Sequence, residues 1–175
     1  IKHKPMLYIL NKADLADQNC LSSWIAYFEK QAIPAIAMNS LEGNATKEIV
    51  SKAKKILKPL FDKEASKGLK SRPFRAMVLG IPNVGKSAFI NRLANRVVAS
   101  TGDKPGVTKA QKYIRVESDF ELMDNPGILW PKFEDLDVAY KLALLGSIKD
   151  DTLPMDDVVL YGLNYLNKVY PGRIE

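Results

Sequence analysis

The sequence predicts an α/β fold in which a mostly parallel sheet carries helices on both faces. Short apolar runs of strand length alternate along the chain with longer segments whose apolar residues recur at helical spacing. Polar segments follow several of the apolar runs, at the sheet edge where open α/β folds bind ligands. A chain of 175 residues suits one such domain, so we expect residues 1–175 to form a single domain.

Residues 5–60 are predicted to form two strands, each followed by a helix. A serine, Ser22 or Ser23, is the expected N-cap of the first helix. Pro59 is expected to kink or end the second helix, and Gly68 is suited to cap its C-terminus. The predicted elements are a strand over 5–10, a helix over 22–30, a strand over 33–38 and a helix over 45–60.

The second part begins with a strand–loop–helix unit and continues with a hairpin. The hairpin turn is predicted at Ser118–Asp119, and the stretch 96–110 has no periodicity and is predicted to be a loop. The predicted elements are a strand over 74–79, a helix over 86–95, strands over 112–117 and 120–123, and helices over 136–148 and 156–168.

The composition excludes several classes of protein. The single cysteine, Cys20, forms no internal disulfide, and with His3 as the only histidine a histidine-based metal site or a Ser/His triad is not expected. No apolar run approaches the roughly 20 residues of a membrane helix, so we expect no membrane partner.

Positive charge is concentrated in one segment. The formal charge is +6, whereas residues 51–75 contain nine Lys/Arg and two acidic residues, a net charge of +7. Two interpretations stay open at this point: a solvated helix face, or an electrostatic footprint for a polyanion such as RNA.

GIPNVGKS, residues 80–87, fits the phosphate-binding pattern G-x-x-x-x-G-K-[ST] with Gly80, Gly85, Lys86 and Ser87. It lies between a predicted strand and a predicted helix, which is the context that this motif requires. Its glycines allow backbone N–H groups to face phosphate oxygens, Lys86 adds a point charge, and Ser87 can ligate Mg²⁺. The alternative, a structural turn, is disfavoured by this placement.

NKAD, residues 11–14, fits the guanine-binding pattern N-K-x-D at the carboxyl end of a predicted strand. Asp14 can accept hydrogen bonds from guanine N1–H and the 2-amino group, which adenine does not offer. Asn11 can bond the Hoogsteen edge, and the stem of Lys12 can cover the base. MNS, residues 38–40, ends the next predicted strand and is similar to the second guanine loop.

DNPG, residues 124–127, also ends a predicted strand. Asp124 is suited to hold Mg²⁺ through water, and the N–H of Gly127 to sense a γ-phosphate. Thr108 lies between the phosphate loop and DNPG, where a threonine that orders around Mg²⁺ and GTP is expected. The alternative for Thr108 is an ordinary loop threonine.

The order of these motifs is unusual, because the base-reading tetrapeptide precedes the phosphate loop. In this order the chain resembles the circularly permuted GTPases, and most closely the ribosome biogenesis GTPase A (YlqF-type) family. NKAD, GIPNVGKS, TGDKPGVT, DNPGILWPKFED and LALLGSIKDD carry the resemblance, which covers nearly the whole chain. Permutation is physically reasonable because the termini of a domain are often close together. The basic segment 51–75 is then the bridge between the two permuted parts.

The resemblance implies a P-loop GTPase domain and a set of site residues. Lys86, Thr108 and Gly127 are expected to serve catalysis, and Asn83 to accompany a K⁺ ion. Expected guanine contacts are Asn11, Lys12, Ala13, Asp14, Asn39 and Ser40; phosphate contacts are Asn83, Val84, Gly85, Lys86, Ser87, Ala88 and Gly127; and Mg²⁺ is expected near Ser87, Thr108 and Asp124.

The chain departs from the family pattern at three points. Asn125 stands where threonine is commoner, which should be tolerated because the backbone acts there. Ala88 stands where a hydroxyl residue is usual. Family members also carry an N-terminal segment with a histidine implicated in hydrolysis, which His3 does not match, and a C-terminal helical domain. We therefore expect the helix within 152–175 to lead to such a domain.

The resemblance further implies a factor that joins the large ribosomal subunit or its precursor late in assembly and contacts rRNA. The sequence leaves the oligomeric state open, and a monomer is the expectation. It implies the bacterial cytoplasm or, for an organellar homologue, the mitochondrion.

The sequence offers no side chain to orient the attacking water at the position where Ras-like enzymes carry one. Ile128 occupies the position at which Ras-like enzymes place a water-orienting glutamine. We therefore expect slow intrinsic hydrolysis that the ribosome stimulates. The alternative is a GTP/GDP-dependent RNA- or ribosome-binding switch with incidental hydrolysis. A third interpretation, an ATP-dependent P-loop kinase, is disfavoured by NKAD.

Overall fold

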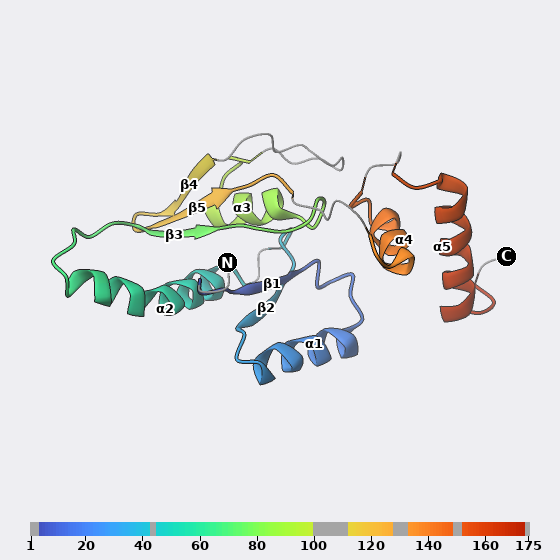
Figure 1. Ribbon diagram of the computed structural model, residues 1–175, viewed down its shortest axis with the longest axis horizontal. Helices are drawn as coiled ribbons and strands as arrows, with labels where there is room; N and C mark the ends of the chain where they lie inside the picture. The colour runs from blue at the N-terminus through green and yellow to red at the C-terminus, as the bar shows by residue number, and fades with distance from the viewer. Residues whose placement is uncertain (1–3, 43–44, 100–111, 128–132, 149–151, 174–175) are drawn as a thin grey trace.

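The computed structural model describes residues 4–42, 45–99, 112–127, 133–148 and 152–173 (Figure 1). Strands and helices alternate through most of this part of the chain, as predicted. The elements are β1 (Tyr8–Asn11), α1 (Gln18–Lys30), β2 (Ala35–Met38), α2 (Thr46–Ala65), β3 (Phe74–Met77), α3 (Lys86–Ala94), β4 (Lys112–Glu117), β5 (Phe120–Asp124), α4 (Leu136–Leu144) and α5 (Met155–Val169).

The strands pair mainly in parallel, which confirms the predicted fold class. β1 pairs with β2 and β3 pairs with β5 in parallel, whereas β4 pairs with β5 antiparallel across the predicted hairpin. Within the described residues they form two sheets, β1-β2 and β3-β5-β4, rather than one continuous sheet. In the part of the chain that the structure describes, no ladder joins β1 to β3, so loops and core side chains connect the two sheets.

One hydrophobic core serves both sheets. Met38 of β2 and Ile90 of α3 are completely buried, and both belong to the same cluster of apolar side chains. α1 packs against β2, α2 against β3, and α3 against β4 and β5. Burial of this shared apolar surface is the main force that fixes the carboxyl ends of β1, β2, β3 and β5 relative to one another. The remaining members of the cluster are Ile36, Ile49, Val50, Phe89, Leu93, Ala99, Ile114, Phe120 and Leu122.

α1 starts one turn earlier than predicted. Its N-cap is Asp17, whose Oδ1 accepts a hydrogen bond from the backbone N–H of Cys20 at 2.9 Å. The hydroxyl groups of Ser22 and Ser23 instead donate to backbone carbonyl oxygens four residues earlier in the helix. Either serine is a possible cap by residue type, but the aspartate supplies the acceptor at the point where the chain enters the helix.

α2 continues through Pro59 to Ala65, so the helix does not end near residue 60. The alternative that was predicted, a kink at this proline, stays a prediction. Pro59 is exposed, and so is Lys55, the residue whose carbonyl has no helical N–H donor at position 59. The prediction that Gly68 caps the helix is confirmed. The N–H of Leu69 donates to the carbonyl of Glu64 and that of Gly68 to Ala65, the two bonds of a Schellman turn.

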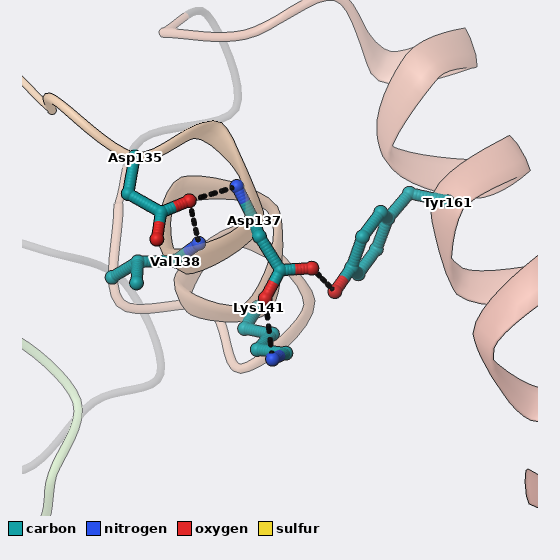
Figure 2. Close-up of polar contacts among 5 residues, drawn as sticks. All are labelled: Asp135, Asp137, Val138, Lys141 and Tyr161. Carbon is teal, nitrogen blue, oxygen red and sulfur yellow. Dashed lines mark hydrogen bonds and ion pairs between the residues drawn. The ribbon is translucent and has the colours of Figure 1, made fainter.

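α4 and α5 pack against each other at one end of the molecule (Figure 1). α4 ends at Leu144, earlier than predicted, because Gly146 at φ 64° forms a second Schellman turn in which the Ser147 N–H donates to the Leu142 carbonyl. Figure 2 shows the start of α4. Asp135 caps it, and Asp137 accepts from Lys141 on the same helix and from the hydroxyl of Tyr161 on α5. Among the described helices, none combines the length and apolarity that crossing a membrane requires.

Candidate nucleotide-binding site

The phosphate loop connects β3 to α3 and exposes the first turn of α3. Gly85 precedes the helix at φ 90°, in the left-handed region, and Asn83 also has a positive φ of 57°. These two left-handed residues turn the loop around the helix N-terminus, whose first N–H groups lack helical acceptors. Lys86 Nζ donates to the Ile81 carbonyl at 2.7 Å, so the ammonium group lies over the loop.

Asn11 of the NKAD segment joins three loops. Its Nδ2 donates to the carbonyl of Val84 in the phosphate loop at 2.8 Å. Its Oδ1 accepts from the backbone N–H of Ser40 at 3.1 Å and from the Ser40 hydroxyl at 2.7 Å. The base-reading segment, the second guanine loop and the phosphate loop therefore meet at one side chain, although Asn11 and Val84 are 73 residues apart.

The guanine loops are also braced by backbone and side-chain contacts. The N–H of Ala13 donates to the carbonyl of Met38 at 3.2 Å, which links the ends of β1 and β2. Gln18 Nε2 donates to the Ala13 carbonyl at 3.0 Å, and Arg92 Nε of α3 donates to the Ser40 carbonyl at 3.0 Å. The sequence analysis did not identify Gln18 or Arg92, because neither belongs to a motif and only the fold brings them to these loops.

The predicted base-reading side chains differ in exposure. Asn39 and Ser40 are buried, whereas Lys12 and Asp14 are exposed at the end of β1. Asn39 Oδ1 accepts from the N–H of Leu41 at 2.9 Å and so shapes its own loop. This arrangement leaves the Asp14 carboxylate accessible to an N–H donor such as guanine presents.

The DNPG segment lies against the phosphate loop. A Cβ atom added to Gly127 would be only 2.9 Å from the backbone nitrogen and 3.0 Å from the Cα of Pro82, so only glycine allows this approach. Asn125 is buried, and its Nδ2 makes long contacts of 3.5 and 3.4 Å with the carbonyls of Val78 and Met123. The side chain of Asn125 is thus packed under the site and directed at its neighbouring backbone.

Asp124 is the buried carboxylate of the site. It is 4% exposed, and its Oδ1 has no hydrogen-bond partner within the described residues. Burial raises the pKa of Asp124 above its ordinary value, and the nearby charge of Lys86 opposes this rise. Burial likewise lowers the pKa of Lys86, against the attraction of Asp124. An unpartnered buried carboxylate oxygen beside a phosphate-binding loop fits a hard cation such as Mg²⁺.

Asn83 connects the phosphate loop to the turn that follows α4. Its Nδ2 donates to the carbonyl of Gly146 at 2.5 Å. The two residues that follow this turn residue, Ser147 and Ile148, are buried. The phosphate loop therefore contacts both the β1–β2 side of the molecule, through Val84, and the α4–α5 side, through Asn83.

The structure thus brings together most of the predicted site residues. The carboxyl ends of β1, β2, β3 and β5 supply, respectively, Asn11–Asp14, Asn39 and Ser40, the segment from Asn83 to Ala88, and Asp124 with Gly127. Thr108, residues 128–132 (which include Ile128) and His3 lie outside the described residues. In the described part of the chain, no three His, Cys, Asp or Glu side chains are placed so that together they could hold a metal ion, so a cation here would need oxygen atoms from other groups.

The fold and these loops define a P-loop GTPase domain in which the base-reading strand precedes the phosphate loop. Residues 75–163 match the family model of the 50S ribosome-binding GTPases, and the chain belongs to this family. Relatives that match the whole of this chain are named ribosome biogenesis GTPase A. Ribosome biogenesis GTPase A of Bacillus licheniformis is 49% identical over 175 residues, which are all of this chain and 62% of that protein. The corresponding protein of Bacillus cereus is 50% identical over all of this chain and 59% of its own length.

Solved structures agree with this assignment. GNP-bound YlqF from Thermotoga maritima matches with a TM-score of 0.63 and 25% identity, over 95% of this chain and 60% of that one. A GDP-bound YlqF structure matches with a TM-score of 0.61 over 93% of this chain. The chain spans about three fifths of the length of these relatives.

Proposed function

We propose that this chain binds GTP and GDP with Mg²⁺, hydrolyses GTP, and belongs to a protein that assists assembly of the large ribosomal subunit. The observation that carries the proposal is the junction at Asn11, because it unites a guanine-reading loop and a phosphate loop in one site. Relatives named ribosome biogenesis GTPase A support the ribosomal role.

In this proposal Asp14 reads the guanine N1–H and 2-amino group, while Lys12 covers the base. Asn11 keeps one N–H of its amide for the Hoogsteen edge, since its other contacts are to Val84 and Ser40. Asn39 and Ser40 contact the base from the loop after β2. The hydrogen bond from the Ala13 N–H to the Met38 carbonyl keeps the NKAD loop beside that loop. Specificity for guanine follows because adenine would leave the Asp14 carboxylate without a donor.

The phosphates are assigned to the N-terminus of α3. Backbone N–H groups from Asn83 to Ala88 face them, and Lys86 exchanges its contact with the Ile81 carbonyl for phosphate oxygens. Mg²⁺ would be held near Ser87, Thr108 and Asp124 and would neutralise charge on the phosphates. The orphaned Oδ1 of Asp124 is the structural support for this assignment.

Catalysis is assigned to Lys86, Thr108 and the N–H of Gly127, which together stabilise the transferring phosphoryl group. Position 128 offers an isoleucine side chain, which has no hydrogen-bonding group to orient water. Intrinsic hydrolysis should therefore be slow, and a large-subunit partner should supply the missing group. We assign the protein to the bacterial cytoplasm and expect it to act as a monomer on rRNA of the subunit.

The experiment that tests this function is steady-state GTP hydrolysis with and without large ribosomal subunits, with Lys86→Ala as the blank. Stimulation by the subunit supports a ribosome-activated GTPase. Tight GDP binding without stimulation would instead support the alternative, a nucleotide-dependent switch. Competition of ADP with bound GDP would contradict guanine recognition.

The K⁺ ion is proposed at Asn83. Because Nδ2 of this side chain donates to Gly146, its Oδ1 is the atom suited to a cation beside the phosphates. Hydrolysis should then be faster in KCl than in NaCl at equal ionic strength. Equal rates in the two salts would refute this assignment.

A further inference from the structure

The nine basic residues of 51–75 fall into two sets in the structure. Four of them are neutralised by carboxylates. Lys54 contacts Glu117 and Asp119 at 2.6 Å each, and the other three pairs are Lys58–Asp62, Arg72–Glu64 and Arg75–Glu121. The remaining five make no ion pair with any residue that the structure describes; they are Lys52, Lys55, Lys63, Lys67 and Lys70.

The unpaired lysines share one side of α2. The helix turns its buried residues Ile49 and Val50 toward the core. At about 100° per residue, Lys52, Lys55 and Lys63 lie within about 80° of one another. Lys55 is on the solvent side of the helix, whereas the half-buried Lys52 and the exposed Lys63 border the side that carries Ile49. Lys67 and Lys70 continue the positive charge just beyond the end of the helix, and both are exposed. We call these five residues the α2 lysine surface.

The α2 lysine surface lies away from the nucleotide site. Lys54 ties the middle of α2 to the β4–β5 hairpin turn, where the Asp119 carbonyl also accepts from the N–H of Phe74 at the start of β3. The phosphate loop follows the other end of β3. In Figure 1 the C-terminal end of α2 and the loop after β3 accordingly lie at opposite ends of that strand.

We propose that the α2 lysine surface binds the sugar–phosphate backbone of duplex RNA. The inference rests on the proposed function, since it identifies the element through which a ribosome assembly factor would hold rRNA. From Lys52 to Lys63 the surface extends about 16 Å, at 1.5 Å per residue, which is enough to follow several phosphates. Lysine ammonium groups on flexible stems meet phosphates as point charges.

The side chains on this side of α2 indicate that it binds RNA without recognising particular bases. Between Lys52 and Lys63 its exposed positions are Lys55, Pro59 and the Lys58–Asp62 pair, none of which is an aromatic side chain for stacking on bases. An RNA helix is recognised mainly through its shape and backbone. Affinity should therefore depend strongly on salt and weakly on sequence.

The test compares two triple variants of equal charge. K55Q/K63Q/K67Q removes exposed members of the α2 lysine surface, and K4Q/K30Q/K168Q removes three exposed lysines elsewhere. Binding of a short fluorescent duplex RNA is measured by anisotropy over a range of KCl concentrations. We expect the first variant to bind at least tenfold more weakly at about 0.1 M KCl, and its plot of log K against log [KCl] to be shallower by about 2–3. The control should change less than threefold.

Three outcomes would overturn the proposal. An equal loss in both variants would mean that overall charge governs binding, and no loss in the first variant would place the RNA elsewhere. Displacement by polyglutamate as effective as by unlabelled RNA would indicate an acidic protein partner. GDP affinity is measured in parallel and should be unchanged in both variants. The wild-type chain is titrated with GDP as well. If it fails to bind GDP, the proposed nucleotide function is wrong, whatever the RNA measurements show, because these lysines are not part of the nucleotide site.

Discussion

Asn11 Nδ2 and the carbonyl oxygen of Val84 are 2.8 Å apart, and this hydrogen bond fastens the end of β1 to the phosphate loop after β3. The same amide accepts two hydrogen bonds from Ser40, so one side chain connects three loops. No strand ladder joins β1 to β3 in the described residues. The relative position of the base reader and the phosphate loop therefore depends strongly on Asn11.

Asn11→Ala is expected to lower both the stability of the nucleotide-free protein and its affinity for GDP. The substitution leaves the Val84 carbonyl and the Ser40 donors without their partner, which costs about 1–3 kcal/mol for such part-buried groups. Asn11→Asp should cost more, because a carboxylate oxygen would then face the Val84 carbonyl. Urea unfolding and titration with a fluorescent GDP measure the two effects, with Asn164→Ala on α5 as the control. Loss of GDP affinity with unchanged unfolding would mean that Asn11 acts only on the base.

Gly85→Ala should be strongly destabilising for two separable reasons. At φ 90° an L-residue is strained by about 1–2 kcal/mol, and the added Cβ would lie 2.4 Å from Asn11 Nδ2. A double-mutant cycle separates these terms, because Asn11→Ala removes the atom that the Cβ meets. In that background Gly85→Ala should cost only the backbone strain. Additive effects in urea unfolding would show that the two residues do not contact each other in solution.

The sequence predicted the site more completely than the helix boundaries. The motif segments lie together as expected, because each has a local chemical requirement, such as a glycine before α3 at Gly85; the role of each residue stays a prediction. The ends of a helix are harder to predict, because several nearby residues can serve as the cap. In α1 the cap is Asp17, and not Ser22 or Ser23. Pro59 is tolerated because its side of α2 is open to solvent. The contact of Arg92 with Ser40 has no local signal, because only the fold brings this residue of α3 to the loop after β2.

Asp124→Asn is expected to leave the nucleotide-free protein as stable as the wild type or more stable at pH 7.5. Burial raises the pKa of Asp124, so the folded state binds this proton more tightly than the unfolded state does. Protonated Asp124 therefore stabilises the folded protein fully below about pH 3.8, the ordinary pKa of an aspartate. This contribution is lost as the pH rises through the raised pKa of Asp124 in the folded state. The advantage of the variant should accordingly shrink as the pH falls from 7.5 toward 4.

The same variant should lose the effect of Mg²⁺. In the wild type Mg²⁺ should strengthen binding of a GTP analogue, whereas Asp124→Asn removes the carboxylate proposed to hold the ion. Unfolding at several pH values and nucleotide titration with and without Mg²⁺ provide the readouts. Asp157→Asn, at an exposed position of α5, controls for loss of one negative charge. A variant that is less stable at neutral pH and still responds to Mg²⁺ would refute the assignment.

Gly162→Ala tests how tightly α5 packs on α4. Gly162 is buried, and an added Cβ would lie 3.1 Å from Leu144 Cδ2. That atom is the end of a flexible side chain, and Leu144 is 49% exposed. Because Leu144 has room to move, the gain in helix propensity of about 1 kcal/mol should outweigh the contact, and urea unfolding should show a stabilised protein. Gly162→Leu, which is too large for the same space, should destabilise the pair and weaken the contact between Tyr161 and Asp137 (Figure 2). If Gly162→Ala were itself destabilising by more than about 1 kcal/mol, Leu144 would be held rigidly and the α4–α5 interface would be close-packed at this point.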